Sequence, residues 1–131
     1  MDSKIKLSRR ELDVMYVLWE ADTPLTAKDI VYKNNSLSIN TVQAVLKGLL
    51  KKEYIEIAEI VYSGTVLTRN YKPALRIDEY MTKFIKDINK HMSTEGLMVA
   101  LLKNEKNEEE LIEKLESVLK QRREMLEKGK A

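Results

Sequence analysis

The sequence predicts a mainly α protein with a small β-hairpin, in which a winged helix-turn-helix is followed by a helical dimerisation module. Apolar residues recur at helical spacing in three stretches before residue 54. Apolar and polar residues then alternate on both sides of a glycine turn, which is typical of a β-hairpin. From residue 76 the spacing is helical again. We therefore expect a winged-helix domain over residues 1–74 and a dimerisation domain over residues 75–131.

The first helix is expected from about residue 9 to 21, after a polar arm over residues 1–7. Ser8 and Glu11 have the spacing of a capping box, in which each side chain accepts the backbone N–H of the other residue. Trp19 lies in register with the apolar face of this helix. We expect it to anchor the core and not to serve as a platform for a ligand.

The second helix is expected to follow a turn at residues 22–25 that runs into a short extended piece. Thr26 and Asp29 repeat the capping pattern, and Ile30 and Val31 are expected to face inward. The helix should end at residues 34–36, Asn-Asn-Ser, because short polar side chains compete there for the backbone hydrogen bonds.

The third helix, expected over residues 38–53, has two unlike faces. Ser38 is a good N-cap. The apolar stripe consists of Val42, Val45, Leu46, Leu49 and Leu50. The other face carries Asn40, Thr41, Gln43, Ala44, Lys47 and Lys51. Amides and hydroxyls near a helix N-terminus, with lysines further on, suit a helix that reads base edges and contacts phosphates. The alternative is the solvated face of an ordinary amphipathic helix, and the helix taken alone favours that alternative.

The hairpin that follows favours the DNA interpretation. Residues 54–60 alternate in polarity, Gly64 lies in the turn, and residues 66–71 form the return strand. Pro73 should stop this strand, because proline cannot donate to the ladder. Three helices followed by a hairpin form a winged helix, in which the third helix is the one normally offered to DNA. A winged helix used only for protein contacts is the alternative.

The remainder of the chain is expected to pair with a second copy. Its apolar spacing predicts a helix from residue 76 to about His91, a short helix capped by Ser93 or Thr94, and a last helix that starts at residue 107. Three helices of this length cannot enclose a good core alone. The dimer contacts should come from Tyr80, Phe84, Ile88, Leu101, Leu102, Leu115 and Leu119. The alternative is a monomer whose C-terminal helices fold back onto the winged helix.

Composition bounds the function. The net charge is only +2, so any electrostatic attraction for DNA must come from local clustering. The sequence has no cysteine, which excludes disulfides and thiolate metal sites. The single histidine, His91, is expected at a helix end, and no catalytic motif is visible. We expect neither an enzyme nor a cofactor nor a metal site. Without a signal peptide or an apolar run long enough for a membrane span, the expected location is the cytoplasm.

Three segments resemble the penicillinase-repressor group, the BlaI/MecI/CopY family of transcriptional repressors. They are residues 7–19 (LSRRELDVMYVLW), residues 38–52 (SINTVQAVLKGLLKK) and residues 71–73 (YKP). The resemblance implies a homodimer that binds an inverted repeat in a promoter and blocks transcription. The positions that match the DNA-contacting residues of the family are Ser38, Asn40, Thr41, Gln43 and Ala44, with Lys51 and Lys52 as contacts to the DNA backbone.

The chain also departs from the family pattern. Gly48 stands where the family usually has an arginine and Glu53 where it usually has a glycine, so the end of the third helix is expected to bend or to contact DNA less strongly. The hairpin is longer than usual and its tip lacks the usual basic residue, which Arg69 or Lys72 would replace. The paired Cys-x-Cys motifs of the copper-responsive members are missing, which rules out thiolate metal sensing.

The resemblance therefore implies a repressor of β-lactam resistance genes. It would be relieved when a membrane sensor-protease system leads to cleavage of the dimerisation domain, near residues 100–102, where the Asn-Phe pair of the family is missing. The repressor itself would have no stable association with the membrane. The alternative is a winged-helix regulator of another family with a small-molecule effector pocket.

Overall fold

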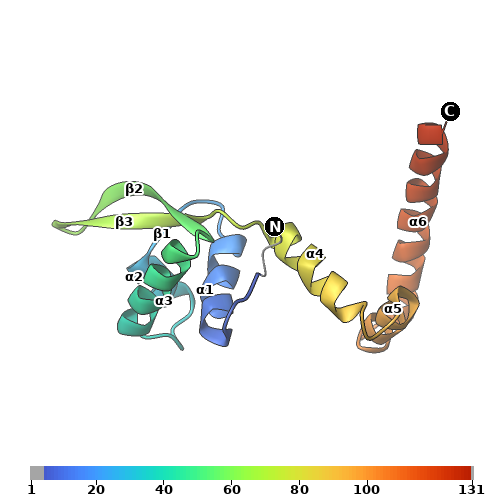
Figure 1. Ribbon diagram of the computed structural model, residues 1–131, viewed down its shortest axis with the longest axis horizontal. Coiled ribbons are helices and arrows are strands. Elements are labelled where there is room, and N and C mark those ends of the chain that lie inside the picture. Colours follow the sequence, from blue (N-terminus) through green and yellow to red (C-terminus); the bar gives the residue numbers. More distant parts are fainter. Residues whose placement is uncertain (1–4, 131) are drawn as a thin grey trace. The chain divides into compact units, whose positions relative to one another are not determined.

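The helices and strands follow the predicted order within residues 5–130, the part of the chain that the computed structural model describes. The N-terminal half contains α1 (Arg9–Glu20), β1 (Leu25–Thr26), α2 (Ala27–Lys33), α3 (Ile39–Lys51), β2 (Ile55–Ser63) and β3 (Val66–Pro73) (Figure 1). Three helices follow: α4 (Ile77–Ile88), α5 (Thr94–Lys103) and α6 (Glu108–Lys130). The predicted polar arm begins in residues 1–4, which lie outside the described residues.

The first three helices begin at the predicted caps. The hydroxyl of Ser8 accepts the Glu11 N–H at 3.2 Å, and the Glu11 carboxylate accepts the Ser8 N–H at 2.9 Å. Thr26 and Asp29 form the second capping box in the same way. α3 packs against both α1 and α2. The side chains buried most completely are Val14, Met15, Leu18, Ile30, Val42, Leu46 and Leu49. They include Val42, Leu46 and Leu49 of the stripe predicted for the third helix, whereas Val45 and Leu50 of that stripe are half-buried. Trp19 packs half-buried against this core, as expected.

A three-stranded antiparallel sheet completes the winged helix. Its strand order is β1-β3-β2, so the short extended piece before α2 pairs with the return strand of the hairpin. A β-bulge lies between Ile57 and Glu59. Gly64 forms the turn with a positive φ of 66°, a conformation that glycine adopts without steric cost. β3 ends at Pro73, as predicted, which lies opposite Ile55.

The chain forms two compact units, and the boundary between them, between Phe84 and Ile85, falls within α4. Its first turns are part of the N-terminal unit, where the rings of Tyr80 and Trp19 lie 5.6 Å apart between centroids. The indole N–H of Trp19 also donates to the Leu75 carbonyl at 2.9 Å. These contacts fix the start of α4 on the winged helix. The domain boundary expected from the sequence, between residues 74 and 75, remains a prediction.

The C-terminal unit has little core of its own. It contains the end of α4 with α5 and α6, and α5 begins at the predicted cap, Ser93. No residue of α5 or of the described part of α6 is fully buried. This agrees with the argument that three helices of this length cannot enclose a core by themselves.

Candidate nucleic-acid interface

One stripe on α3 presents side chains suited to DNA. Asn40, Gln43, Ala44, Lys47 and Lys51 are all exposed, and they follow the three- and four-residue steps of a single helix face. We call these five residues the recognition stripe. Within residues 5–130, neither the Asn40 nor the Gln43 amide has a hydrogen-bond partner in the chain. Both amides are therefore available to base edges.

Ser38 and Thr41 are engaged with each other at the start of α3. The Ser38 hydroxyl accepts the Thr41 N–H at 3.1 Å and donates to the Thr41 hydroxyl at 3.0 Å. Ser38 is exposed and Thr41 half-buried. The cap places both residues at the positive end of the helix dipole, which favours a phosphate nearby.

Lys52 forms an ion pair inside the protein. Its Nζ donates to both carboxylate oxygens of Glu11 at 2.8 Å, and Glu11 is only 8% exposed. Burial raises the pKa of Glu11, but the hydrogen bond and charge of Lys52, together with the Ser8 N–H, lower it below its ordinary value. The pair joins the start of α1 to the end of α3. A contact of Lys52 with the DNA backbone remains a prediction, although the Lys52 side chain already pairs with Glu11 within the protein.

Gly48 lies on the side of α3 that faces α1. A Cβ at this position would lie 3.6 Å from a carboxylate oxygen of Glu11. The helix continues through Gly48 to Lys51, and the Gly48 carbonyl accepts the Lys52 N–H at 3.0 Å. A weaker contact of this end of α3 with DNA remains a prediction. Gly48 therefore lies off the recognition stripe.

Arg69 is the wing cation that is available to a ligand. We call β2, β3 and their turn, residues 55–73, the wing. The Lys72 amine lies 3.3 Å from the Glu56 carboxylate on the neighbouring strand, whereas Arg69 is exposed and lies opposite Ile60. Among the described residues, no carboxylate pairs with Arg69. Of the two predicted substitutes for the basic tip residue, the geometry favours Arg69.

Two exposed features were missed in the sequence. Tyr32, on α2, is 89% exposed although its helix packs on the core. The wing also exposes apolar side chains, namely Ile57, Ile60, Tyr62, Val66 and Leu67. Their alternation was interpreted as the pattern of a half-buried strand. The sequence does contain one sign that this hairpin is unusual, because no acidic residue occurs from residue 60 to residue 77.

The predicted dimer contacts lie in both units. Tyr80 and Phe84 belong to the N-terminal unit, where their rings stack at 6.4 Å between centroids. Burial and the nearby Tyr16 raise the pKa of Tyr80. In the C-terminal unit, Leu101 and Leu119 are exposed. Ile88, Leu102 and Leu115 are half-buried. Apolar side chains are thus left without cover along α4, α5 and α6.

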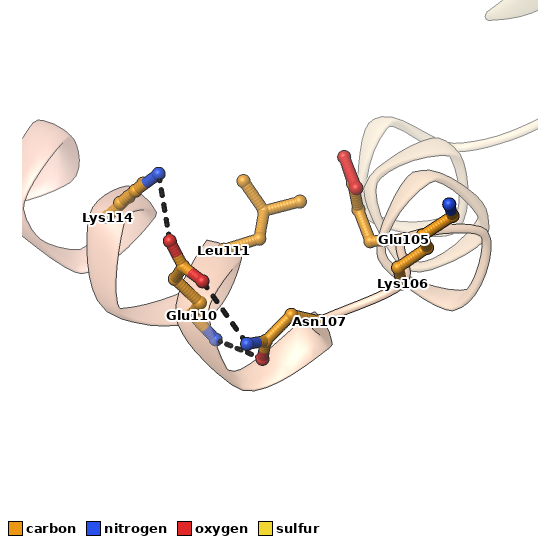
Figure 2. Close-up of a pocket in the computed structure, with 6 residues that line it drawn as sticks. All are labelled: Glu105, Lys106, Asn107, Glu110, Leu111 and Lys114. Carbon is orange, nitrogen blue, oxygen red and sulfur yellow. Dashed lines mark hydrogen bonds and ion pairs between the residues drawn. The ribbon is translucent and has the colours of Figure 1, made fainter.

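A hollow of about 250 Å³ lies at the start of α6 in the C-terminal unit (Figure 2). Glu105, Lys106, Asn107, Glu110, Leu111 and Lys114 line it. Glu110 pairs with Lys114 at 3.2 Å, and the Asn107 side chain accepts the Glu110 N–H at 3.1 Å. Leu111 is the one apolar lining residue. This polar hollow differs from the mostly apolar pockets that bind small molecules.

The described residues contain no cluster of three or more histidine or acidic side chains that could hold a metal ion. None of the helices in the described part of the chain is both long and apolar enough to cross a membrane.

The family model described as "Penicillinase repressor" matches residues 7–121 of the chain. A search of the curated proteins found none that matches this chain. The Helicobacter pylori ferric uptake regulator Fur is 29% identical over 55% of this chain and 48% of that chain, with a TM-score of 0.43. Staphylococcus aureus MarR in complex with salicylate and kanamycin is 17% identical over 91% and 72%, with a TM-score of 0.44. NMB1585, a MarR family regulator from Neisseria meningitidis, is 20% identical over 88% and 81%, with a TM-score of 0.42. The chain therefore spans about half of the Fur chain.

Proposed function

The chain belongs to the penicillinase repressor family of DNA-binding transcriptional repressors, and from this premise we propose that it represses transcription as a homodimer on an inverted-repeat operator. The observation that carries the proposal is the recognition stripe on α3, whose amides have no partner among the described residues. Repression of this kind requires no catalysis by the protein, because a bound dimer blocks the promoter.

We propose that α3 lies in the major groove of each half-site. Asn40 and Gln43 carry amides, which bind adenine through two hydrogen bonds, and Ala44 offers a methyl group to thymine. Lys47 and Lys51 contact phosphates on either side, as does the cap formed by Ser38 and Thr41. The base contacts choose the sequence, and the phosphate contacts fix the position of the helix.

The homodimer is proposed from the exposed apolar side chains of the C-terminal helices. Leu101 and Leu119 are more than half exposed, and α4, α5 and α6 contain no fully buried residue among those described. Burying these side chains against a second copy would stabilise both chains. A twofold dimer requires an inverted repeat, whose half-sites are separated by about one helical turn or a multiple of it.

The regulated genes and the inducer are proposed from family membership alone. We propose that the chain controls β-lactam resistance genes in the cytoplasm, and that a membrane sensor-protease system relieves repression by cleavage of the dimerisation domain. The expected region, residues 100–102, lies in α5. The alternative of a regulator from another family is not retained, since the family is established.

The proposal is tested by fluorescence-anisotropy titration of labelled DNA from the promoter of its own gene, at two salt concentrations, against a scrambled duplex. We expect the promoter to be bound more tightly by a factor of about a thousand or more, with two chains for each inverted repeat. Equal affinity for the two duplexes would contradict sequence-specific repression. One chain for each inverted repeat would contradict the homodimer.

A further inference from the structure

One of the lysines in the second half of α3 and its cap differs from the others. Lys47 and Lys51 belong to the recognition stripe, and among the described residues no carboxylate pairs with either of them. Lys52, the C-cap, has its amine within hydrogen-bond distance of three acceptors. A lysine ammonium carries three N–H donors. The donors of Lys52 can therefore all be satisfied inside the protein.

Glu11 supplies two of the three acceptors. Each of its carboxylate oxygens lies 2.8 Å from the Lys52 amine. Glu11 is 8% exposed, whereas the Lys52 side chain is 43% exposed. Burial raises the pKa of Glu11, but the hydrogen bond from Lys52, with those from Ser8, lowers it below its ordinary value. The carboxylate is therefore charged at neutral pH, and removing its cation would leave a mostly buried charge with less compensation.

The N-terminal arm supplies the third acceptor. The Lys6 carbonyl lies 3.5 Å from the Lys52 amine, and the Lys6 N–H donates to the Tyr54 hydroxyl at 3.3 Å. Ile5 and Leu7, on either side of Lys6, pack against the core. The backbone of the arm is therefore fixed at the end of α3, and Lys52 is held from the arm as well as from α1.

The ion pair lies off the recognition stripe. A Cβ at Gly48 would lie 3.6 Å from a carboxylate oxygen of Glu11, so this carboxylate lies against the side of α3 that carries position 48. Lys52 has helical backbone angles, and successive residues of a helix are about 100° apart around its axis. Lys51 and Lys52 therefore leave α3 in different directions. The stem of a lysine is flexible, so a released Lys52 amine could turn toward the same DNA backbone as Lys51.

We propose that Glu11 is a positioning residue that holds the Lys52 ammonium away from the DNA phosphates and so limits the affinity for DNA of any sequence. This inference rests on the proposed function, because it concerns how α3 contacts DNA. It differs from the phosphate contact that the family resemblance implies for Lys52. An ammonium that stays with a carboxylate of its own protein displaces no counterion from DNA, so Lys52 should contribute nothing to the salt dependence of binding.

The slope of log affinity against log salt reports the number of phosphate contacts. Lys52→Met should leave this slope as in wild type. Glu11→Gln should steepen it by about one and tighten binding to promoter and scrambled duplexes alike, by about fivefold at low salt, because a neutral amide holds the ammonium less strongly than a carboxylate does. Glutamine at this position of a capping box can still accept the Ser8 N–H, so α1 keeps its cap.

Two controls separate release of Lys52 from loss of a carboxylate. Glu53→Gln removes an exposed carboxylate at the next position, which pairs with no cation among the described residues, and it should leave the slope close to wild type. Glu11→Gln combined with Lys52→Met should lack the steeper slope, because no ammonium is left to release. The full-length proteins are titrated by anisotropy at several salt concentrations, after circular dichroism has established that each is folded.

A slope reduced by about one in folded Lys52→Met would overturn the inference and assign Lys52 a phosphate contact. An unchanged slope in folded Glu11→Gln would also contradict it. An equal increase with and without Lys52 would attribute the effect to the lost carboxylate, against the positioning role. If Glu11→Gln did not fold, the slope of Lys52→Met would decide.

The two duplexes keep this inference separate from the proposed function. Failure of the wild type to prefer the promoter would contradict sequence-specific repression, whereas the slopes on the scrambled duplex would still test the role of Glu11. Preference for the promoter together with a reduced slope in Lys52→Met would uphold the proposed function and overturn the positioning role alone.

Discussion

Gln43 and Lys51 are both exposed on α3, but their chemistry assigns them different tasks. A primary amide carries a donor and an acceptor in a fixed geometry, so it can distinguish adenine from the other bases. An ammonium group is a point charge, which any phosphate satisfies. In the proposed complex, the recognition stripe therefore combines side chains that select a sequence with side chains that bind all DNA.

The first prediction separates these tasks. Gln43→Ala should cost about 1–3 kcal/mol on the promoter and little on scrambled DNA, because it removes a base contact. Lys51→Ala should weaken binding to both duplexes and reduce the salt slope by about one. Anisotropy titrations at several salt concentrations measure both effects. Equal losses on promoter and scrambled DNA for Gln43→Ala would argue against a base contact.

The ion pair between Glu11 and Lys52 gives a second prediction at this scale. Because the pKa of Glu11 is lowered in the folded state, the pair should stabilise the fold fully above the ordinary pKa of 4.5. That stabilisation should be lost as the pH falls through the lowered folded-state pKa. Lys52→Met should reduce the free energy of unfolding by about 1–2 kcal/mol at neutral pH, since it leaves a buried carboxylate with fewer partners.

Urea unfolding of wild type and Lys52→Met, at neutral pH and near pH 3, tests this sign. The difference between the two proteins should shrink in acid. Glu11→Gln with Lys52→Met completes a double-mutant cycle, which isolates the coupling between the two side chains. A difference that stays constant or grows in acid would contradict the assigned direction of the pKa shift.

At the scale of the element, the end of α3 combines a regular cap with a strained residue. The Tyr54 N–H donates to the Leu49 carbonyl and the Glu53 N–H to the Leu50 carbonyl, each at 3.0 Å, which is the hydrogen-bond pattern of a Schellman motif. Glu53 occupies the left-handed position of this motif, with φ at 64°. A side chain there is strained, and glycine is the residue that usually fills it.

Glu53→Gly should therefore increase the free energy of unfolding by about 0.5–1 kcal/mol, because relief of the strain exceeds the extra flexibility of glycine in the unfolded chain. Thermal and urea unfolding measure the change. Glu53→Ala is the matched control, since alanine removes the carboxylate but keeps the Cβ. If alanine stabilised the protein as much as glycine, the effect would come from charge and not from backbone strain.

The helices, strands and caps could be predicted because their signals are local. A capping box needs only Ser8 and Glu11, and a turn needs only Gly64 and its neighbours. The pairing of β1 with β3 had no comparable signal, since β1 consists of Leu25 and Thr26 alone. The recognition stripe followed from helical spacing, whereas the partner of Lys52 lies forty-one residues away in the sequence and could not be inferred from spacing.

For the whole molecule, the proposed affinity for an operator depends on two winged helices acting together in a homodimer. Linking two binding modules makes the second contact intramolecular, so a dimer binds an inverted repeat far more tightly than one domain binds a half-site. The exposed apolar side chains of the C-terminal helices are the surface on which this linkage is proposed. DNA binding and assembly should therefore weaken together.

The corresponding prediction uses α6. Leu119→Glu should shift the protein toward monomer and weaken promoter binding at least about tenfold, because a carboxylate would be buried at the proposed interface. Lys120→Ala, at the next position, is the control and should leave both properties close to wild type. Sedimentation velocity reports assembly and anisotropy reports binding. A monomeric wild type, or a dimeric Leu119→Glu with full affinity, would contradict the proposed interface.

The sequence by itself determined the order of the elements, the caps that begin them and the family, since these depend on residue type at short separations. Tertiary structure decided which of the predicted side chains remain available. In the folded chain Lys52 pairs with Glu11, Gly48 lies on the side of α3 that faces α1, and several apolar side chains of the wing are exposed. The physical reason is that burial and pairing depend on neighbours distant in the chain, and only the packed fold brings those neighbours together.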